Sequence, residues 1–286
     1  MLEQLKERVC RANLQLVEYG LVVLTWGNVS ALSEDGKYIV IKPSGVSYDI
    51  MKPEHMVVTD REGNVVEGDL RPSTDLATHV EIYRNFPGVG GVVHTHSRFA
   101  TAMAQAELDL PCYGTTHADY FYGAVPCTRH LTKAEIAEDY EANTGKVIAE
   151  TFAERGIDPA AVPAVLVRKH GPFAWGPTPE KAVENGLVLD ECARMAFITR
   201  QFNSEVPAAP QEIMDKHYYR KHGAGAYYGQ KEFEKQGILP RSCDTIGETG
   251  APWGPRSFST RRNAYVYLPD RRKTCNEERP RSAGRQ

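Results

Sequence analysis

Two histidines, His94 and His96, stand two residues apart at the end of an apolar stretch. Because alternate side chains of a β-strand point to the same side, both imidazoles can approach one metal ion. A pair of this kind is also compatible with histidines buried in a core. His170 ends a second apolar stretch, and three imidazoles would leave one coordination position open, as in catalytic zinc sites. These positions therefore indicate a three-histidine metal site, provided that the fold brings His170 to the other two.

Three turns rich in small polar residues offer backbone amides and hydroxyls to an anion. They are Gly27-Asn28, Ser44-Gly45 shortly after Lys42, and Ser73-Thr74 at an expected helix start. A helix N-terminus also favours negative charge, so the turns together suit one phosphate group. Taken singly, each is more often only a turn or a cap. No P-loop and no G-x-G-x-x-G is present, which favours a small phosphate ester over a nucleotide.

A polar and aromatic loop, residues 114–123, contains Asp119. A partly desolvated carboxylate there could exchange protons, while a carboxylate that caps a turn is an equal alternative. A basic aromatic stretch follows at residues 216–223. We expect no nucleic-acid partner, because residues 1–230 carry 22 Lys and Arg against 30 Asp and Glu and show no nucleic-acid motif.

The composition, with 286 residues of which 41% are hydrophobic and 25% charged, indicates a folded protein with a sizeable core. The apolar runs have the length of strands, well short of the ~20 residues of a membrane-spanning helix. The first 19 residues match neither a secretory signal nor a transit peptide, so we expect a cytoplasmic protein with no membrane partner. Six cysteines without a C-x-x-C spacing favour reduced thiols and argue against a thiolate zinc site.

The charge is divided unevenly. Residues 231–286 carry 12 Lys and Arg against 7 Asp and Glu, a net charge of +5, whereas residues 1–230 carry a net charge of -8. Glycine, proline and arginine dominate the basic segment. We expect one α/β domain over residues 1–230 and a disordered basic tail over residues 231–286.

Hydrophobic periodicity and capping signals predict helices that alternate with short strands. Expected helices cover residues 2–19, a segment beginning at 73–75, residues 97–106, residues 132–154 and residues 178–202. Expected strands cover residues 25–31, 38–42, 56–59, 65–67, 91–96, 164–168 and 173–175. The pattern predicts an α/β fold with helices flanking a central antiparallel or mixed sheet.

Several segments, in order and spread over residues 1–230, resemble the L-ribulose-5-phosphate 4-epimerase family within the class II aldolase/epimerase superfamily. They are Leu24-Thr-Trp-Gly-Asn-Val-Ser30, Ile41-Lys-Pro-Ser-Gly-Val46, Val93-His-Thr-His-Ser97, Gly114-Thr-Thr-His-Ala-Asp-Tyr-Phe-Tyr-Gly123, His170-Gly-Pro-Phe-Ala-Trp-Gly176 and His217 with Ala226-Tyr-Tyr-Gly-Gln230. The resemblance implies a three-layer α/β/α fold. It also implies a homotetramer with active sites between subunits and one Zn²⁺ or similar divalent ion per subunit.

The resemblance assigns roles to matching positions. It implies that His94, His96 and His170 bind the metal, with Asp75 as a further ligand or near-ligand. The implied substrate-binding residues are Gly27, Asn28, Lys42, Ser44, Gly45, Ser73 and Thr74. Asp119 and Tyr228 would be the acid/base pair, with Tyr228 supplied by the neighbouring subunit and His217 and Arg220 nearby. Thr74 stands where serine is expected, which keeps the hydroxyl.

The implied activity is the interconversion of L-ribulose 5-phosphate and D-xylulose 5-phosphate in pentose (L-arabinose-type) catabolism. Retro-aldol cleavage of the C3–C4 bond and re-addition would invert C4, with the metal stabilising an enediolate and two proton-transfer groups on opposite sides. The alternative is a class II aldolase that cleaves a deoxysugar phosphate such as L-fuculose 1-phosphate, a branch with glutamate at the position of Asp75. A metallohydrolase and a non-enzymatic metal-binding protein are more distant alternatives.

Overall fold

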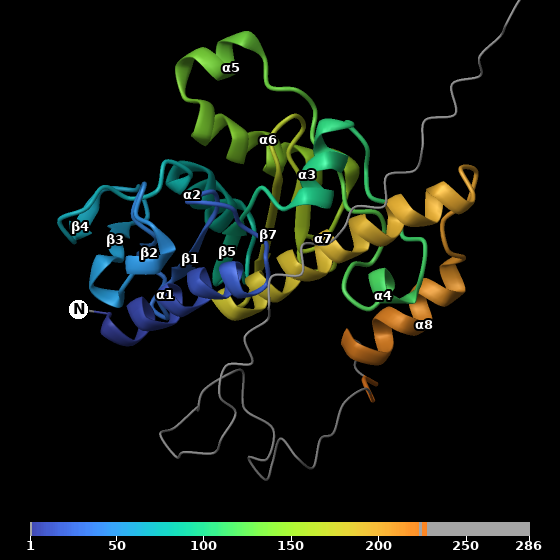
Figure 1. Cartoon of the computed structure of the whole chain (residues 1–286), viewed down its shortest axis with the longest axis horizontal. Coiled ribbons are helices and arrows are strands. Elements are labelled where there is room, and N and C mark those ends of the chain that lie inside the picture. The colour runs from blue at the N-terminus through green and yellow to red at the C-terminus, as the bar shows by residue number, and fades with distance from the viewer. Residues whose placement is uncertain (1, 223–224, 228–286) are drawn as a thin grey trace, which may run out of the picture. The chain divides into compact units, whose positions relative to one another are not determined.

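An antiparallel sheet forms the centre of the computed structural model, which describes residues 2–222 and 225–227 (Figure 1). The described part of the chain contributes seven strands in the order β4-β3-β2-β1-β5-β7-β6. The strands are β1 (Asn28–Leu32), β2 (Tyr38–Ile41), β3 (Val57–Asp60), β4 (Val65–Glu67), β5 (Gly91–His94), β6 (Ala164–Leu166) and β7 (Pro172–Gly176). Every pairing between neighbouring strands is antiparallel, so the expected antiparallel or mixed sheet is antiparallel.

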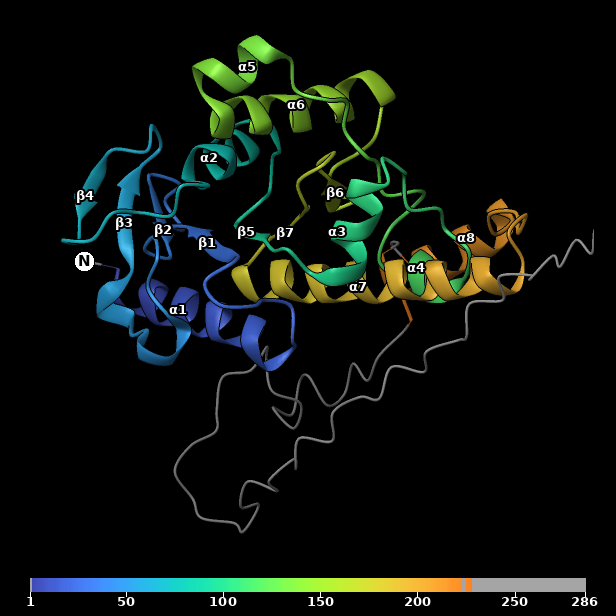
Figure 2. The same cartoon turned by 45° about the horizontal axis from the view of Figure 1, so that its top comes forward.

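Helices cover both faces of this sheet. The described helices are α1 (Glu3–Glu18), α2 (Leu76–Asn85), α3 (Arg98–Gln105), α4 (Thr115–Ala118), α5 (Lys133–Glu138), α6 (Tyr140–Arg155), α7 (Pro179–Phe202) and α8 (Gln211–His222), with 3-10 turns η1 (Tyr48–Ile50) and η2 (Pro53–His55). Figure 2 shows α1 and α7 on one side of the sheet and α2, α5 and α6 on the other. The predicted three-layer α/β/α fold is confirmed.

The core is packed on both sides of the central strands. On one side, the Trp175 ring of β7 lies 4.9 Å from that of Phe86, which directly follows α2, and 5.3 Å from that of Phe152 in α6, measured between centroids. On the other side, α7 approaches so closely that a Cβ on Gly186 would lie 3.1 Å from Cγ1 of Val93. Because both faces are covered, every residue of β5 and β7 is buried, and neither strand shows the alternation of a half-exposed strand.

Capping residues in the sequence predicted most helix boundaries correctly. The Thr132 hydroxyl accepts from the Glu135 amide in a capping box, and the Thr178 hydroxyl accepts from the Lys181 amide at the start of α7. Gly156 ends α6 in the left-handed region, at φ 61°. The prediction of a single helix over residues 132–154 was wrong, because the chain leaves helical geometry at Asp139, where φ is -152°. The Asp139 carboxylate then caps α6 by accepting from an amide of its first turn.

Helix α2 starts where it was predicted, but the expected side-chain cap is not formed. The helix begins at Leu76, directly after Asp75, but no side-chain cap hydrogen bond is formed there. The Asp75 carboxylate instead accepts a hydrogen bond from Asn28. Helix α8 was not predicted, and residues 115–118 form a short helix within the expected loop.

The predicted domain boundary at residue 230, the tail over residues 231–286 and Tyr228 all lie outside the described residues. Among the helices that the structure describes, none is both long and apolar enough to cross a membrane.

Candidate active site

The candidate site lies at one end of the sheet, where segments far apart in sequence meet. Asn28 at the start of β1 pairs with His94 at the end of β5, and His94 also pairs with Phe173 near the start of β7. Strand β2 runs antiparallel to β1 and therefore ends on the same side, where Lys42 follows it. Since antiparallel neighbours alternate in direction, the start of one strand and the end of the next lie together at the same end of the sheet.

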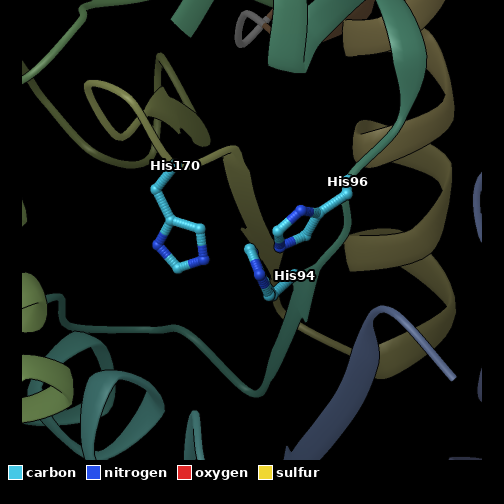
Figure 3. A group of neighbouring side chains, drawn as sticks. All are labelled: His94, His96 and His170. Atoms are coloured by element: carbon cyan, nitrogen blue, oxygen red, sulfur yellow. The ribbon is translucent and has the colours of Figure 1, made fainter. Parts of the chain in front are cut away.

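Three imidazoles converge at this end of the sheet (Figure 3). The nearest ring nitrogens of His94, His96 and His170 all lie within 4.8 Å of one another, and the ring centroids are 4.7 to 5.2 Å apart. Nδ1 of His94 lies 2.9 Å from the carbonyl oxygen of Pro172, so Nδ1 carries the proton and Nε2 keeps its lone pair. The fold thus brings His170 to the other two histidines.

Burial keeps these imidazoles neutral. Desolvation lowers the pKa of His94, of His96 and of His170, the last to about 3, and the neighbouring imidazoles lower the values for His96 and His170 further. A neutral imidazole has a free lone pair, which is the form that binds a metal ion.

Asp75 adds a negative charge beside the three histidines. Nδ2 of Asn28 donates to Oδ2 of Asp75 over 2.7 Å. Burial alone would raise the pKa of Asp75, but the imidazoles of His94 and His79 and the hydrogen bond from Asn28 outweigh burial and hold the pKa below its usual range. Three nitrogen donors with an ionised carboxylate fit a divalent, zinc-type ion.

A buried hydrogen-bond chain supports the site from within the core. Oγ of Ser30 lies 2.7 Å from Nδ1 of His79 and 2.8 Å from the hydroxyl of Tyr83. Nε2 of His79 and Oδ1 of Asn28 are buried and have no hydrogen-bond partner among the described residues. Buried polar atoms without partners are uncommon, so these two atoms are candidates for contact with a ligand or a bound water.

The predicted anion turns share one cavity of about 430 Å³ with the histidines. Its lining includes Gly27, Asn28, Lys42, Ser44, Gly45, Ser73, Thr74, Asp75, His94, His96 and His170. The turn at Ser44 and the segment before α2 are joined by two backbone hydrogen bonds. The Ser44 amide donates to the Arg71 carbonyl and the Ser73 amide to the Lys42 carbonyl, both over 2.9 Å. The Lys42 side chain is buried in this wall, and burial lowers its pKa.

Other residues of the cavity were not predicted as site residues. Tyr140 and Glu141, from the start of α6, line it, and the Tyr140 hydroxyl lies 3.3 Å from Nδ1 of His170. Thr25 and Trp26 also line it, and the half-exposed Trp26 ring lies 6.3 Å from that of His96. The interruption of the helix at Asp139, which places Tyr140 here, has no strong local signal in the sequence.

Asp119, His217 and Arg220 form a second cluster, between α4 and α8. Nη2 of Arg220 lies 2.9 Å from Oδ1 and 2.8 Å from Oδ2 of Asp119, and Nδ1 of His217 lies 3.1 Å from Oδ1. Burial alone would raise the pKa of Asp119, but the hydrogen bonds from Arg220 and His217 keep it below the usual range. Within the described residues, none of the three lines the histidine cavity.

Comparison with known proteins agrees with this architecture. Residues 7–197 match the family described as class II aldolase and adducin N-terminal domain. An L-fuculose 1-phosphate aldolase of known structure is 25% identical, with a TM-score of 0.65 over 76% of this chain and 95% of that chain.

Two further solved structures are similar. YgbL from Escherichia coli is 26% identical, with a TM-score of 0.60 over 75% of this chain and 97% of that one. The L-fuculose-1-phosphate aldolase from Thermus thermophilus is 25% identical, with a TM-score of 0.56 over 71% and 99%. The chain therefore belongs to the class II aldolase and adducin N-terminal domain family.

Proposed function

We propose that this protein is a metal-dependent L-ribulose-5-phosphate 4-epimerase, an isomerase of pentose (L-arabinose-type) catabolism. The observation that carries the proposal is the partly buried Asp75, held by Asn28 at 2.7 Å beside three histidines in a cavity lined by the predicted anion-binding turns. Membership of the class II aldolase family and the sequence resemblance both support this chemistry.

In this proposal His94, His96 and His170 hold a Zn²⁺ or similar divalent ion, and Asp75 lies beside it as a fourth ligand or counter-charge. When bound, such an ion supplies a Lewis acid that polarises the oxygens of the substrate. The Pro172 carbonyl fixes the tautomer of His94 and so keeps Nε2 available for the ion.

The turns around the cavity would bind the sugar phosphate. Ser44, Gly45, Ser73 and Thr74 supply backbone amides and hydroxyls, and the Lys42 ammonium supplies the positive charge. Held by its phosphate, the two-carbon fragment formed on cleavage of the C3–C4 bond can turn over and present its opposite carbonyl face. Re-addition then inverts C4 without loss of either fragment.

Asp119 and Tyr228 would exchange the proton of the C4 hydroxyl, with His217 and Arg220 in support. Since the Asp119 cluster does not line the histidine cavity of its own chain, we propose that it completes the cavity of a neighbouring copy in a homotetramer. Exposed apolar side chains on α7, including Phe197 and Phe202, support an assembly that covers this helix.

Cleavage of a deoxysugar phosphate is the second candidate, because two of the similar structures are L-fuculose 1-phosphate aldolases. The resemblance places a glutamate at the position of Asp75 in that branch, where a longer carboxylate can act as a base. Here the carboxylate is one methylene shorter and is tied to Asn28, which favours epimerisation.

Product analysis tests the proposal. Zinc-loaded full-length protein should convert L-ribulose 5-phosphate into D-xylulose 5-phosphate, and the metal-depleted protein should not. Release of dihydroxyacetone phosphate from L-fuculose 1-phosphate, without epimerisation, would establish the aldolase instead. Free phosphate as the product would indicate a hydrolase, and unchanged activity after metal depletion would refute the Lewis-acid role.

A further inference from the structure

The turn that carries His170 contains a strained residue. The Val167 amide donates to the Gly171 carbonyl over 2.9 Å, and the His170 amide donates to the Val167 carbonyl over 3.0 Å. Between them, Lys169 has a φ of 62°, in the left-handed region that is unfavourable for a residue with a side chain. The direction of the His170 ring therefore depends on what holds Lys169 in this conformation.

Three contacts hold Lys169 to the C-terminal end of α3 and to the residues that follow it. Its amide donates to the Ala104 carbonyl over 3.1 Å, and its Nζ donates to the Gln105 carbonyl over 2.8 Å. Nζ also lies 2.7 Å from Oε1 of Glu107. The last carbonyls of a helix lack intrahelical partners and carry partial negative charge, so the ammonium caps α3 from another segment.

Glu107 is the centre of this contact region. Its carboxylate also lies 3.3 Å from Nη1 of Arg168 and 3.3 Å from Nε2 of His130. Its own φ is 63°, so two of the four non-glycine residues with positive φ in the described part of the chain are ion-paired with each other. Two strained turns are thus joined through one carboxylate.

Helix α3 links this ion pair to the other side of the metal site. It begins two residues after His96, and its first amides, those of Phe99 and Ala100, donate to Oδ1 of Asp190 in α7, each over 2.9 Å. Its far end is capped by Lys169. One helix, fixed at both ends, therefore sets the distance between the segments that carry His96 and His170.

We propose that Glu107, acting through Lys169, is a positioning residue that holds His170 in register with His94 and His96. The inference rests on the proposed function only in taking these three histidines as metal ligands. Glu107 itself lines no part of the histidine cavity, so its effect is on the preorganisation of the site. Removing its charge takes away the ion pair and leaves only the two contacts with the carbonyls of Ala104 and Gln105 to hold Lys169 at positive φ. Part of the metal-binding free energy is then spent on ordering the turn.

Zinc affinity of the full-length protein, measured by competition with a chromophoric chelator at low ionic strength, tests this role without any substrate. The Glu107→Gln and Lys169→Met variants should each bind zinc about fivefold more weakly, the scale of one partly exposed ion pair. Lys169→Gly should bind within about twofold of wild type, because glycine adopts positive φ without strain. Adding Glu107→Gln to Lys169→Gly should cause no further loss.

Two controls make the result specific. Glu191→Gln removes another carboxylate that is ion-paired at the surface, with Arg194 on α7, and should leave zinc affinity unchanged. His96→Ala measures zinc bound elsewhere on the chain. Wild-type affinity in Glu107→Gln, or an equal loss in Lys169→Gly and Lys169→Met, would overturn the proposal. Weaker zinc binding in Glu107→Gln without any epimerase activity in wild type would retain this inference and reject the proposed function.

Discussion

The guanidinium of Arg220 holds the carboxylate of Asp119 by both oxygens, through Nη2 at 2.9 and 2.8 Å and Nε at 3.1 Å. The two residues are 101 positions apart and join α8 to the segment after α4. The proposed proton-exchange group therefore also helps to attach α8. An ionised carboxylate in this state is suited to accept a proton before it donates one.

The stability of the protein should depend on pH through Asp119. Its pKa in the folded state lies below the unfolded value of about 3.9, so its contribution is present above that value and is lost as the pH falls through the folded pKa. Asp119→Asn should lower the free energy of unfolding by about 2 kcal/mol at pH 7, and the difference should shrink below about pH 4. Urea unfolding of both proteins across this range measures it.

A pH-independent difference would show that the amide disturbs packing, and no difference at pH 7 would show that the ion pair contributes little. Asp49→Asn is a control at an exposed carboxylate, and it should show neither effect.

Substitution of either proposed proton-exchange residue should reduce catalysis and leave metal binding unchanged. Asp119→Asn and Tyr228→Phe should each reduce the rate of epimerisation by about 10²- to 10⁴-fold, the usual range for loss of a general acid or base. Zinc content, measured by atomic emission, should stay at the wild-type level because neither residue is a proposed ligand. Normal rates in both variants would mean that the proton-transfer roles belong to other residues.

Metal binding should stabilise the fold through the three histidines. Zinc at about 100 times its dissociation constant should add about 2.7 kcal/mol to the free energy of unfolding, because the ion binds only the assembled site. The thermal midpoint should rise with zinc in wild type. If His96→Ala showed the same rise, the ion would be binding elsewhere.

Lys42 should act on the phosphate group of the substrate. Lys42→Met should raise KM for L-ribulose 5-phosphate by about tenfold or more, since a charge-assisted contact to phosphate is lost. Any slow turnover of unphosphorylated L-ribulose should be unchanged, which makes that sugar the internal control. An equal effect on both sugars would indicate a change in the metal site or in folding.

Gly27 should not tolerate a side chain. It has a φ of 108°, and a Cβ there would lie 2.9 Å from the His94 carbonyl oxygen and 2.8 Å from Cγ1 of Val22. Gly27→Ala should cost about 3 kcal/mol of stability and weaken zinc binding, because the clash displaces the strand end that carries His94. Gly36→Ala is the matched control, with a φ of 70° and open space around it, and it should cost about 1 kcal/mol. Equal losses in the two variants would refute the close approach.

The parts of the fold that were predictable from sequence depend on short-range signals. The Thr132 capping box, the Thr178 N-cap and the left-handed Gly156 act within one helical turn of their own residues, so the sequence around them carries the information. The strands of the core were found because apolar, β-branched runs are bounded by turn residues. The sequence indicated His170 as a possible third ligand but left open whether it meets His94 and His96. His170 lies in the turn between β6 and β7, and the pairing of β7 with β5 brings it to the other two.

The unpredicted parts depend on contacts distant in sequence. Helix α8 has no buried residues and so no apolar stripe. Its attachment relies on Tyr122 and Asp119, whose partners in α8 are 93 and 101 residues away. Tyr140 and Glu141 reach the cavity because the helix is interrupted at Asp139, within a stretch whose composition suits an uninterrupted helix. In each case the deciding interaction lies outside any local window.

The pairing of Asn28 with His94 has a consequence for how the protein folds. Side chains alternate along a strand, so a slip of one residue between β1 and β5 would turn the His94 imidazole to the α7 side of the sheet. The three-histidine site therefore exists in one strand alignment only, and that alignment joins segments separated by more than sixty residues. Zinc uptake during refolding, followed with a chromophoric chelator, therefore reports when the central strands reach their native alignment, and the local helices are expected to form before it.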